Sequence, residues 1–229
     1  MFKKLFTLFQ LGRKIAKSDI LTITSKFQKP PLAIKILFKI LSFSFSEKKQ
    51  VDINKSEGER LSNSLESMGT TFIKLGQFLA TRPDIIGEEL SKKLENLQDK
   101  LPPFSLLQAK EIIKNDLGED TYNSIIDLSE PVAAASIAQV HKAQINDDGT
   151  IKDVAIKILR PNIKKIFNEE IDAIMLFAFL IESFIKKTKR LKLVEVVFLL
   201  KEITNLEMDL RFEAAAANEY AENTKNDAG

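Results

Sequence analysis

The 229 residues are enough for one large domain or two small ones, and a hydrophobic share of 44% allows a real core. Basic and acidic residues nearly balance, 34 against 32, so the net charge of +2 gives no argument for a nucleic-acid partner. The absence of cysteine excludes a disulfide scaffold and a thiolate metal site, and the single His141 cannot form a histidine cluster, so we expect no metal ligands in this chain.

Residues 1–55 are expected to form amphipathic helices. The first helix has an apolar face with most of its basic residues elsewhere, and a second apolar segment with interspersed lysines spans residues 30–45. A basic helix of this kind can lie in a membrane interface, or it can pack on the rest of the protein, and both alternatives stay open. Secretion is not expected, because polar residues interrupt the apolar stretch and no cleavage pattern follows. The apolar face consists of Phe2, Leu5, Phe6, Phe9 and Ala16.

Helix-spaced apolar residues predict helices over residues 56–101, interrupted by Pro83 and Gly87. This region contains the motif K-x-G-Q, formed by Lys74, Gly76 and Gln77. Lys74 and Gln77 are three residues apart, so one helix face presents a cation and an amide together. A glycine inside a helix costs about 1 kcal/mol of stability relative to alanine. Gly76 therefore either allows another backbone to approach closely or is incidental, with no particular role.

A short helix is predicted between Ser105, its expected N-cap, and Gly118, which closes it. Strands are expected from about Val132, as a β-hairpin of residues 136–145 and 151–159 with Gly149 at positive φ in the turn N-D-D-G. Helices are predicted from Asn162 to the region of residue 221. The apolar run at residues 173–181 is shorter than the roughly 18 residues of a membrane span and predicts a buried helix.

The return strand contains V-A-I-K, a signature in which protein kinases place a lysine, here Lys157, against nucleotide phosphates. Kinases have a glycine-rich loop upstream, whereas this chain has Ala133, Ala134, Ala135 and Ser136. Alanine at a left-handed position costs about 1 kcal/mol or more, so we expect a stiff, helix-like turn that presents backbone N–H groups and the Ser136 hydroxyl. Such a turn indicates a nucleotide site biased away from ordinary phosphoryl transfer, or no nucleotide site.

Three carboxylates follow on the helix expected after Glu202, namely Glu207, Asp209 and Glu213. Asp209 and Glu213 are four residues apart and are expected on one helix face. One of the three is predicted to pair with Lys157, because a lysine in a partly dry cleft needs a carboxylate partner. The alternative is that these three carboxylates simply form a charged helix face in contact with solvent.

These motifs occur in a fixed order: K-x-G-Q followed by TRPDIIGEEL, then AAASIAQVHKA with VAIK, then E-x-D followed by RFEAAAANEY. In this order they resemble the UbiB family, the atypical kinase-like proteins of ubiquinone biosynthesis, from about residue 56 to the end of the chain. The resemblance implies an α+β fold. A helical K-x-G-Q extension is expected over residues 56–127, and part of a protein-kinase-like N-lobe, with a short β-hairpin sheet and helices, over residues 128–229.

The resemblance also assigns roles to site residues. Lys157 is implied to contact phosphate, with Glu213 as its helix partner. The helical extension is implied to fold over the active site and to block protein substrates, and the E-x-D carboxylates are expected to meet it. This regulatory motif consists of Lys74, Gly76, Gln77, Glu207 and Asp209. The other implied nucleotide-binding residues are Val132, Ala133, Ala134, Ala135, Ser136, Ile137, Ala138, Gln139 and Val140.

The chain departs from the kinase pattern because it contains no segment for the second lobe, where the catalytic aspartate and the metal ligands lie. We therefore expect the N-terminal part of such a protein, inactive alone, that binds ATP or ADP with Mg²⁺ held by the second lobe. The implied partners are a membrane surface or lipid and other ubiquinone-biosynthesis proteins, at the cytoplasmic side of the inner membrane. The alternative is a non-catalytic helical module that binds a membrane or a partner.

Overall fold

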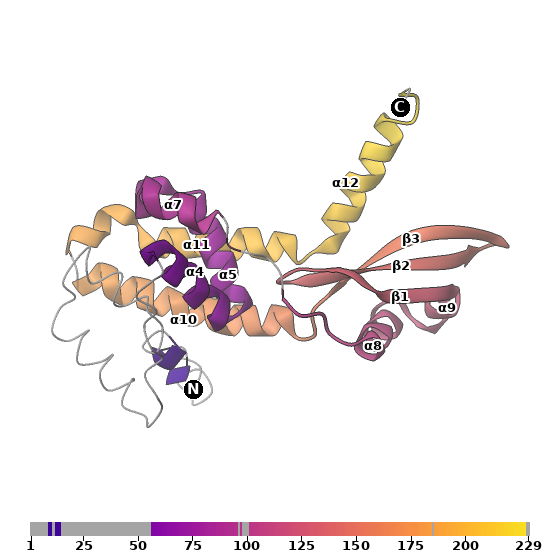
Figure 1. The fold of residues 1–229 in the computed structure, drawn as a ribbon, viewed down its shortest axis with the longest axis horizontal. Coiled ribbons are helices and arrows are strands. Elements are labelled where there is room, and N and C mark those ends of the chain that lie inside the picture. Colours follow the sequence, from indigo (N-terminus) through magenta and orange to yellow (C-terminus); the bar gives the residue numbers. More distant parts are fainter. Residues whose placement is uncertain are drawn as a thin grey trace. The chain divides into compact units, whose positions relative to one another are not determined.

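The computed structural model describes residues 9–10, 12–14, 56–95, 97, 101–184 and 186–227. They belong to two compact units, one formed by residues 1–99 and 165–201 and the other by residues 100–164 and 202–229. In its described part the first unit is helical, and the second contains a small antiparallel sheet (Figure 1). The predicted α+β fold is thereby confirmed, and the functional division at residues 55 and 127 stays a prediction.

The first unit has helices before and after the sheet in the sequence. Ser56 and Glu59 form a capping box at its first described helix, which explains why that helix begins there. The early helices are α4 (Glu57–Met68), α5 (Thr70–Ala80), α6 (Pro83–Ile86) and α7 (Glu88–Leu94). The later ones are α10 (Ile163–Phe184), the 3-10 helix η1 (Lys186–Leu191) and α11 (Leu193–Glu207), of which residues 165–201 belong to this unit.

Helix α10 contains the apolar run at residues 173–181, and only one of its faces is buried. Ala173 and Ala178 are 3% and 5% exposed, whereas Leu176 and Phe179 are 40% and 58% exposed. The prediction of a buried helix is therefore correct for one face only. Among the described residues, no helix combines the length and the apolar run that crossing a bilayer requires.

Most of the predicted amphipathic region, residues 1–55, lies outside the described residues. Phe9, Gln10 and residues 12–14 are described, and all are helical. The Nζ of Lys14 donates to the backbone oxygen of Met68 at 3.2 Å and lies 2.8 Å from a carboxylate oxygen of Glu170. Within the first unit, this lysine therefore joins the described N-terminal residues to the end of α4 and to α10.

The second unit is built on a three-stranded antiparallel sheet, β1 (Ile125–Ala134), β2 (Ala138–Asp147) and β3 (Thr150–Leu159), in that spatial order. The predicted hairpin corresponds to β2 and β3 and is confirmed, whereas the prediction was wrong in leaving out most of β1. The turn between β2 and β3 was predicted correctly. Asp148 and Gly149 have φ of 49° and 86°, as a two-residue hairpin turn requires.

One face of the sheet is covered by α8 (Leu106–Leu117), with α9 (Glu119–Asn123) beside it, as Figure 1 shows. Ser105 caps α8 through a capping box with Gln108, and Gly118 ends it at φ 84°, both as predicted. Ala109 and Ile113 of α8 pack with Ile158 of β3 as the core of this unit. The last helix of the described residues is α12 (Leu210–Asn223).

Candidate nucleotide site

The register of the sheet places three predicted site residues in one row. Ala133 on β1 is opposite Val140 on β2, and Val140 is opposite Lys157 on β3. Directly opposite residues point to the same face of a sheet. Their neighbour Ile158 belongs to the core beneath α8, so the row lies on the face away from α8.

Lys157 forms the predicted ion pair with Glu213. The Nζ atom lies 2.9 Å from Oε1 and 2.6 Å from Oε2, joining β3 to α12 across 56 residues of sequence. The two side chains are 37% and 59% exposed, so the pair is more open to solvent than the cleft predicted for it. An exposed pair contributes about 0–1 kcal/mol to stability, so its importance lies in where it holds the two groups.

The alanine-rich segment differs from the predicted helix-like turn. Ala133 and Ala134 pair with Val140 and Gln139 as the last residues of β1. The chain then reverses, with the Ala135 N–H donating to the oxygen of Ala138 at 2.8 Å. Neither alanine nor serine here has positive φ. The segment therefore turns as a link between strands, without the left-handed conformations that disfavour alanine.

Arg160 fixes this turn, and the sequence analysis did not identify it. The side-chain Nε and Nη2 atoms of Arg160 donate to the backbone oxygen of Ala135 at 2.9 and 2.8 Å. The backbone N–H of Arg160 donates to the backbone oxygen of Ile137 at 2.9 Å. The same guanidinium donates to the oxygens of Pro102 at 2.9 Å and Leu101 at 3.2 Å. All these acceptors are backbone carbonyls, so no side-chain pattern pointed to this residue.

The predicted nucleotide-binding residues divide into a buried and an exposed group. Ser136 is fully buried, so the expectation that its hydroxyl is presented for a ligand does not match its position. Val132 is 55% exposed. The buried group is Ser136, Ile137, Ala138 and Gln139, and the exposed or half-buried group is Val132, Ala133, Ala134, Ala135 and Val140. Only the second group has side chains that reach solvent, and nucleotide contact by either group stays a prediction.

Gln139 belongs to a buried polar network with His141. Its Oε1 accepts from the Phe104 N–H at 2.9 Å, and its Nε2 donates to the Phe104 oxygen at 3.2 Å. Nε2 also lies 2.9 Å from His141 Nε2, while His141 Nδ1 lies 2.7 Å from the Ser129 oxygen. These contacts fit a neutral imidazole with its proton on Nδ1. The side chain of Gln139 thus joins β2 to the segment before α8.

The K-x-G-Q residues all lie in α5. Gly76 is buried, and a Cβ atom there would stand 2.8 Å from Cδ1 of both Leu65 and Leu97. The close approach that this glycine permits is therefore by leucine side chains and not by a backbone. Contact between this motif and the E-x-D carboxylates stays a prediction.

The E-x-D residues lie at a break between two helices, which corrects the single continuous helix predicted there. Glu207 ends α11, and Asp209 is the N-cap of α12. Asp209 and Glu213 are thus not i and i+4 within one helix. The side-chain hydrogen bonds from Arg211, 2.8 and 2.5 Å long, lower the pKa of the Asp209 carboxyl to about 2.

Comparison with known proteins identifies the family of this chain. The family model of the ABC1 atypical kinase-like domain matches residues 96–229. Curated relatives described as "Probable protein kinase UbiB" come from Marinobacter nauticus, 35% identical over 197 residues, and Vibrio cholerae, 33% identical over 226 residues. Another, from Azotobacter vinelandii, is 38% identical over 165 residues.

The alignments with these three relatives cover 86%, 98% and 72% of this chain, and 35%, 40% and 30% of the relatives themselves. The chain thus spans well under half the length of the curated relatives it matches. The predicted resemblance to the UbiB proteins is confirmed, and the chain belongs to the ABC1 atypical kinase-like family.

Proposed function

We propose that this chain is the nucleotide-binding first-lobe part of a UbiB-type atypical kinase or ATPase that supports ubiquinone biosynthesis. The observation that carries the proposal is the Lys157–Glu213 pair, which joins the V-A-I-K strand to a later helix. A kinase lysine needs such a carboxylate to hold it in position for phosphate. Family membership adds support, because the pair lies within the matched residues 96–229.

In this proposal ATP or ADP with Mg²⁺ binds at the sheet face that carries Ala133, Val140 and Lys157. The Lys157 side chain is 37% exposed, so its ammonium group is proposed to meet a phosphate while it remains paired with Glu213. As a compact point charge, it suits the α- and β-phosphates of a nucleotide. The exposed end of β1 contributes the neighbouring wall. The Mg²⁺ ligands and the catalytic aspartate are expected in the second lobe.

Binding of a fluorescent ATP analogue to the 229-residue chain tests this proposal. Lys157→Ala is expected to weaken binding by about tenfold, because a charge-assisted contact of about 1.4 kcal/mol is lost. Lys152→Ala is the matched control, since Lys152 lies on the same strand and pairs with Asp147 at its own end of the sheet. Equal affinities for the parent chain and Lys157→Ala would remove the nucleotide-site interpretation.

We further propose that this chain alone hydrolyses no ATP above background. Phosphoryl transfer depends on groups placed around the γ-phosphate and Mg²⁺, and this chain offers a lysine and a glutamate open to solvent. Supplying a second lobe, as a fusion or a co-expressed partner, is expected to give Mg²⁺-dependent turnover that Lys157→Ala abolishes. Hydrolysis by the isolated chain that Lys157→Ala removes would contradict this part of the proposal.

The K-x-G-Q extension is proposed to restrict access to the nucleotide site through Lys74 and the E-x-D carboxylates. A Lys74→Ala variant of the two-lobed protein is then expected to gain activity towards a protein substrate such as casein or towards itself. Unchanged phosphorylation in that variant would contradict a blocking role.

Peripheral attachment to the cytoplasmic side of the inner membrane, beside other ubiquinone-biosynthesis proteins, completes the proposal. Its basis is the phenylalanine face and flanking lysines of the first 17 residues. Deleting those residues is expected to reduce co-sedimentation with anionic vesicles. Equal sedimentation with and without them would remove their part in attachment.

A non-catalytic module that binds a partner is the second candidate. It is favoured by large apolar side chains exposed on α10 and α11, where Phe179 is 58% and Phe198 is 56% exposed. Exposed apolar surface of this kind often marks an interface. Nucleotide binding that depends on Lys157 separates the first candidate from this one.

A further inference from the structure

Helices α10 and α11 form an antiparallel hairpin in the first unit, with η1 at the end where they join (Figure 1). The Nζ atom of Lys201 lies 3.0 Å from a carboxylate oxygen of Asp172, so the two helices lie side by side. The backbone N–H of Val194, in the first turn of α11, donates to a carboxylate oxygen of Glu182, near the end of α10, at 3.3 Å. These contacts fix the end of the hairpin, residues 184–192, which we name the hairpin tip.

The hairpin tip is strongly basic. Residues 186–192 have the sequence K-K-T-K-R-L-K, with five cations and no carboxylate, whereas the whole chain has a net charge of only +2. The nearest carboxylates in the sequence, Glu182 and Glu195, offset two of the five charges and leave three in excess. Charges of one sign that gather in this way create a local potential, which attracts an anionic surface.

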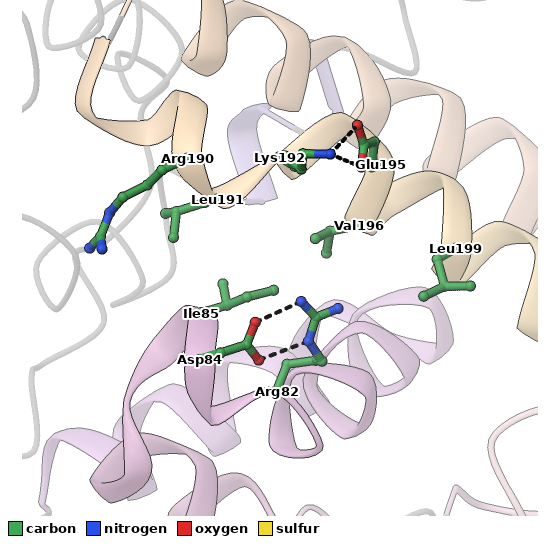
Figure 2. Close-up of a pocket in the computed structure, with 9 residues that line it drawn as sticks. All are labelled: Arg82, Asp84, Ile85, Arg190, Leu191, Lys192, Glu195, Val196 and Leu199. Atoms are coloured by element: carbon green, nitrogen blue, oxygen red, sulfur yellow. Dashed lines mark hydrogen bonds and ion pairs between the residues drawn. The ribbon is translucent and has the colours of Figure 1, made fainter.

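Two of these cations are available to an external partner. Lys189 and Arg190 are exposed, and neither side chain forms a hydrogen bond or an ion pair within the part of the chain that the structure describes. Lys192 is also exposed, but its Nζ donates to both carboxylate oxygens of Glu195, at 3.0 and 2.9 Å. Figure 2 shows the Arg190 side chain extending away from that pair and from the pocket beside it.

Exposed phenylalanines accompany this charge. Phe184, the last residue of α10, is 69% exposed, and Phe179 is 58% exposed. A helix rises about 1.5 Å per residue, so Phe179 lies about 7.5 Å further back along the helix axis. Amphipathic segments bury their apolar groups about 5–10 Å into the boundary between lipid headgroups and acyl chains. Entry of the hairpin tip along the axis of α10 therefore brings both rings within that depth.

The surface of an anionic bilayer matches both properties of the hairpin tip. Its headgroups attract exposed lysine and arginine, and phenylalanine rings partition just beneath them. An acidic protein partner needs a groove shaped for the end of a helical hairpin, whereas a fluid lipid surface adapts to it.

From this combination we infer that the hairpin tip docks on an anionic lipid bilayer, with Lys189 and Arg190 at the headgroups and Phe184 below them. The inference deepens the proposed membrane attachment, but it does not rest on the first 17 residues, which are the basis of that proposal. A test must therefore report on the hairpin tip itself, and not only on attachment of the whole chain.

A fluorophore at the hairpin tip provides such a test. The chain has no tryptophan, so Phe184→Trp introduces a single one. With vesicles of phosphatidylcholine and phosphatidylglycerol, the tryptophan emission is expected to shift to shorter wavelength, and lipids brominated on their acyl chains are expected to quench it. Vesicles of phosphatidylcholine alone are expected to cause neither change. The matched control is Tyr220→Trp, at a 71% exposed position on α12, and we expect it to stay unquenched.

Two double variants with the same loss of charge test the role of the cations. Lys189→Gln combined with Arg190→Gln is expected to weaken co-sedimentation with the anionic vesicles at least tenfold, because each basic residue near such a surface adds about fivefold. Lys142→Gln combined with Lys165→Gln neutralises two exposed lysines outside the hairpin tip and is expected to change binding less than threefold.

Three results would overturn the inference. The first is a Phe184→Trp variant that sediments with anionic vesicles while its emission stays unchanged, which is also the result expected if the hairpin tip docks on an acidic protein instead. If deletion of residues 1–17 then abolishes sedimentation, the proposed attachment stands without the hairpin tip. The second is loss of the emission shift and quenching, at saturating lipid, when residues 1–17 are deleted from Phe184→Trp. The third is an equal loss of binding in the two double variants, because binding then depends on net charge alone.

Discussion

Replacing Gly76 by alanine is expected to destabilise the first unit, although alanine is the better helix former. Gly76 lies inside α5 and is buried. A Cβ atom there would meet Cδ1 of both Leu65 and Leu97 at 2.8 Å. Carbon atoms prefer a separation of about 3.5–4.0 Å, so each methyl group must retreat by roughly 0.7 Å or more. Both leucines are almost fully buried, at 3% and 5% exposure, which leaves little room to retreat.

Two opposing terms set the size of the effect. An extra methyl group in a packed core costs about 1–3 kcal/mol. The gain in helix propensity from glycine to alanine is about 1 kcal/mol. With two leucines to displace, we expect the packing term to be larger, for a net loss of about 1 kcal/mol. In a chain of this size that loss lowers the melting temperature by about 2–4 °C.

Thermal unfolding followed by circular dichroism measures this loss. The matched control is Asn63→Ala in α4, at an exposed helical position where only propensity changes, and it is expected to be neutral or slightly stabilising. A Gly76→Ala variant that melts above the parent chain would refute the packing argument. It would show that the leucine methyl groups move aside freely, and the glycine of K-x-G-Q would then need a reason other than packing.

Three further outcomes are expected. Between about pH 4 and pH 2 the parent chain should lose more stability to acid than the Asp209→Asn variant. The Asp209 carboxyl has a folded-state pKa of about 2, so it stabilises the folded protein at pH values above its ordinary pKa, and this stabilisation is lost as the pH falls through 2. Urea unfolding across that pH range measures the difference. Gln139→Leu should lower the free energy of unfolding by about 2–4 kcal/mol, since it leaves buried polar groups of Phe104 and His141 without their partner, and an equal stability to the parent chain would contradict the network. Gly149→Ala, at φ 86° with open space around the missing Cβ, should cost about 1–2 kcal/mol through backbone strain alone, as thermal unfolding can check.

Elements whose ends are marked by local chemistry were predictable from the sequence. Helix α8 begins at Ser105, with Gln108 three residues later, and ends at Gly118, so both ends are encoded by neighbouring residues. The turn at Asp148 and Gly149 is encoded in the same way. In each case a few adjacent residues determine the backbone, without help from distant parts of the chain.

Strand β1 was missed because its pattern is interrupted. It is an edge strand with register shifts between Ile125 and Asp127, Leu128 and Pro131, and Pro131 and Ala133. Each shift breaks the alternation of inward and outward side chains that reveals a strand in a sequence. The proline points away from a strand as well, although an edge or a bulge accepts it.

Within the candidate site, the pairing of Lys157 with Glu213 was predictable from motif order, whereas the break before α12 was not. The break at Met208 and Asp209 has no glycine or proline to mark it. The break depends instead on Asp209, which caps the next helix. A continuous helix would show the same sequence pattern, so the sequence does not reveal the break. The burial of Ser136 likewise follows from the fold of the whole second unit, which no local pattern shows.

The contacts of Arg160 have a consequence for how any ligand meets the alanine-rich turn. One guanidinium ties the Ala135 carbonyl to those of Leu101 and Pro102, so the turn holds one conformation when the second unit has folded. Ordering a residue costs about 1–2 kcal/mol of conformational entropy, and here that loss occurs during folding instead of during binding. A flexible loop can mould itself around many ligands and loses entropy each time. A turn fixed in this way selects ligands by shape, and a ligand that needs it to move must first break the bonds of Arg160.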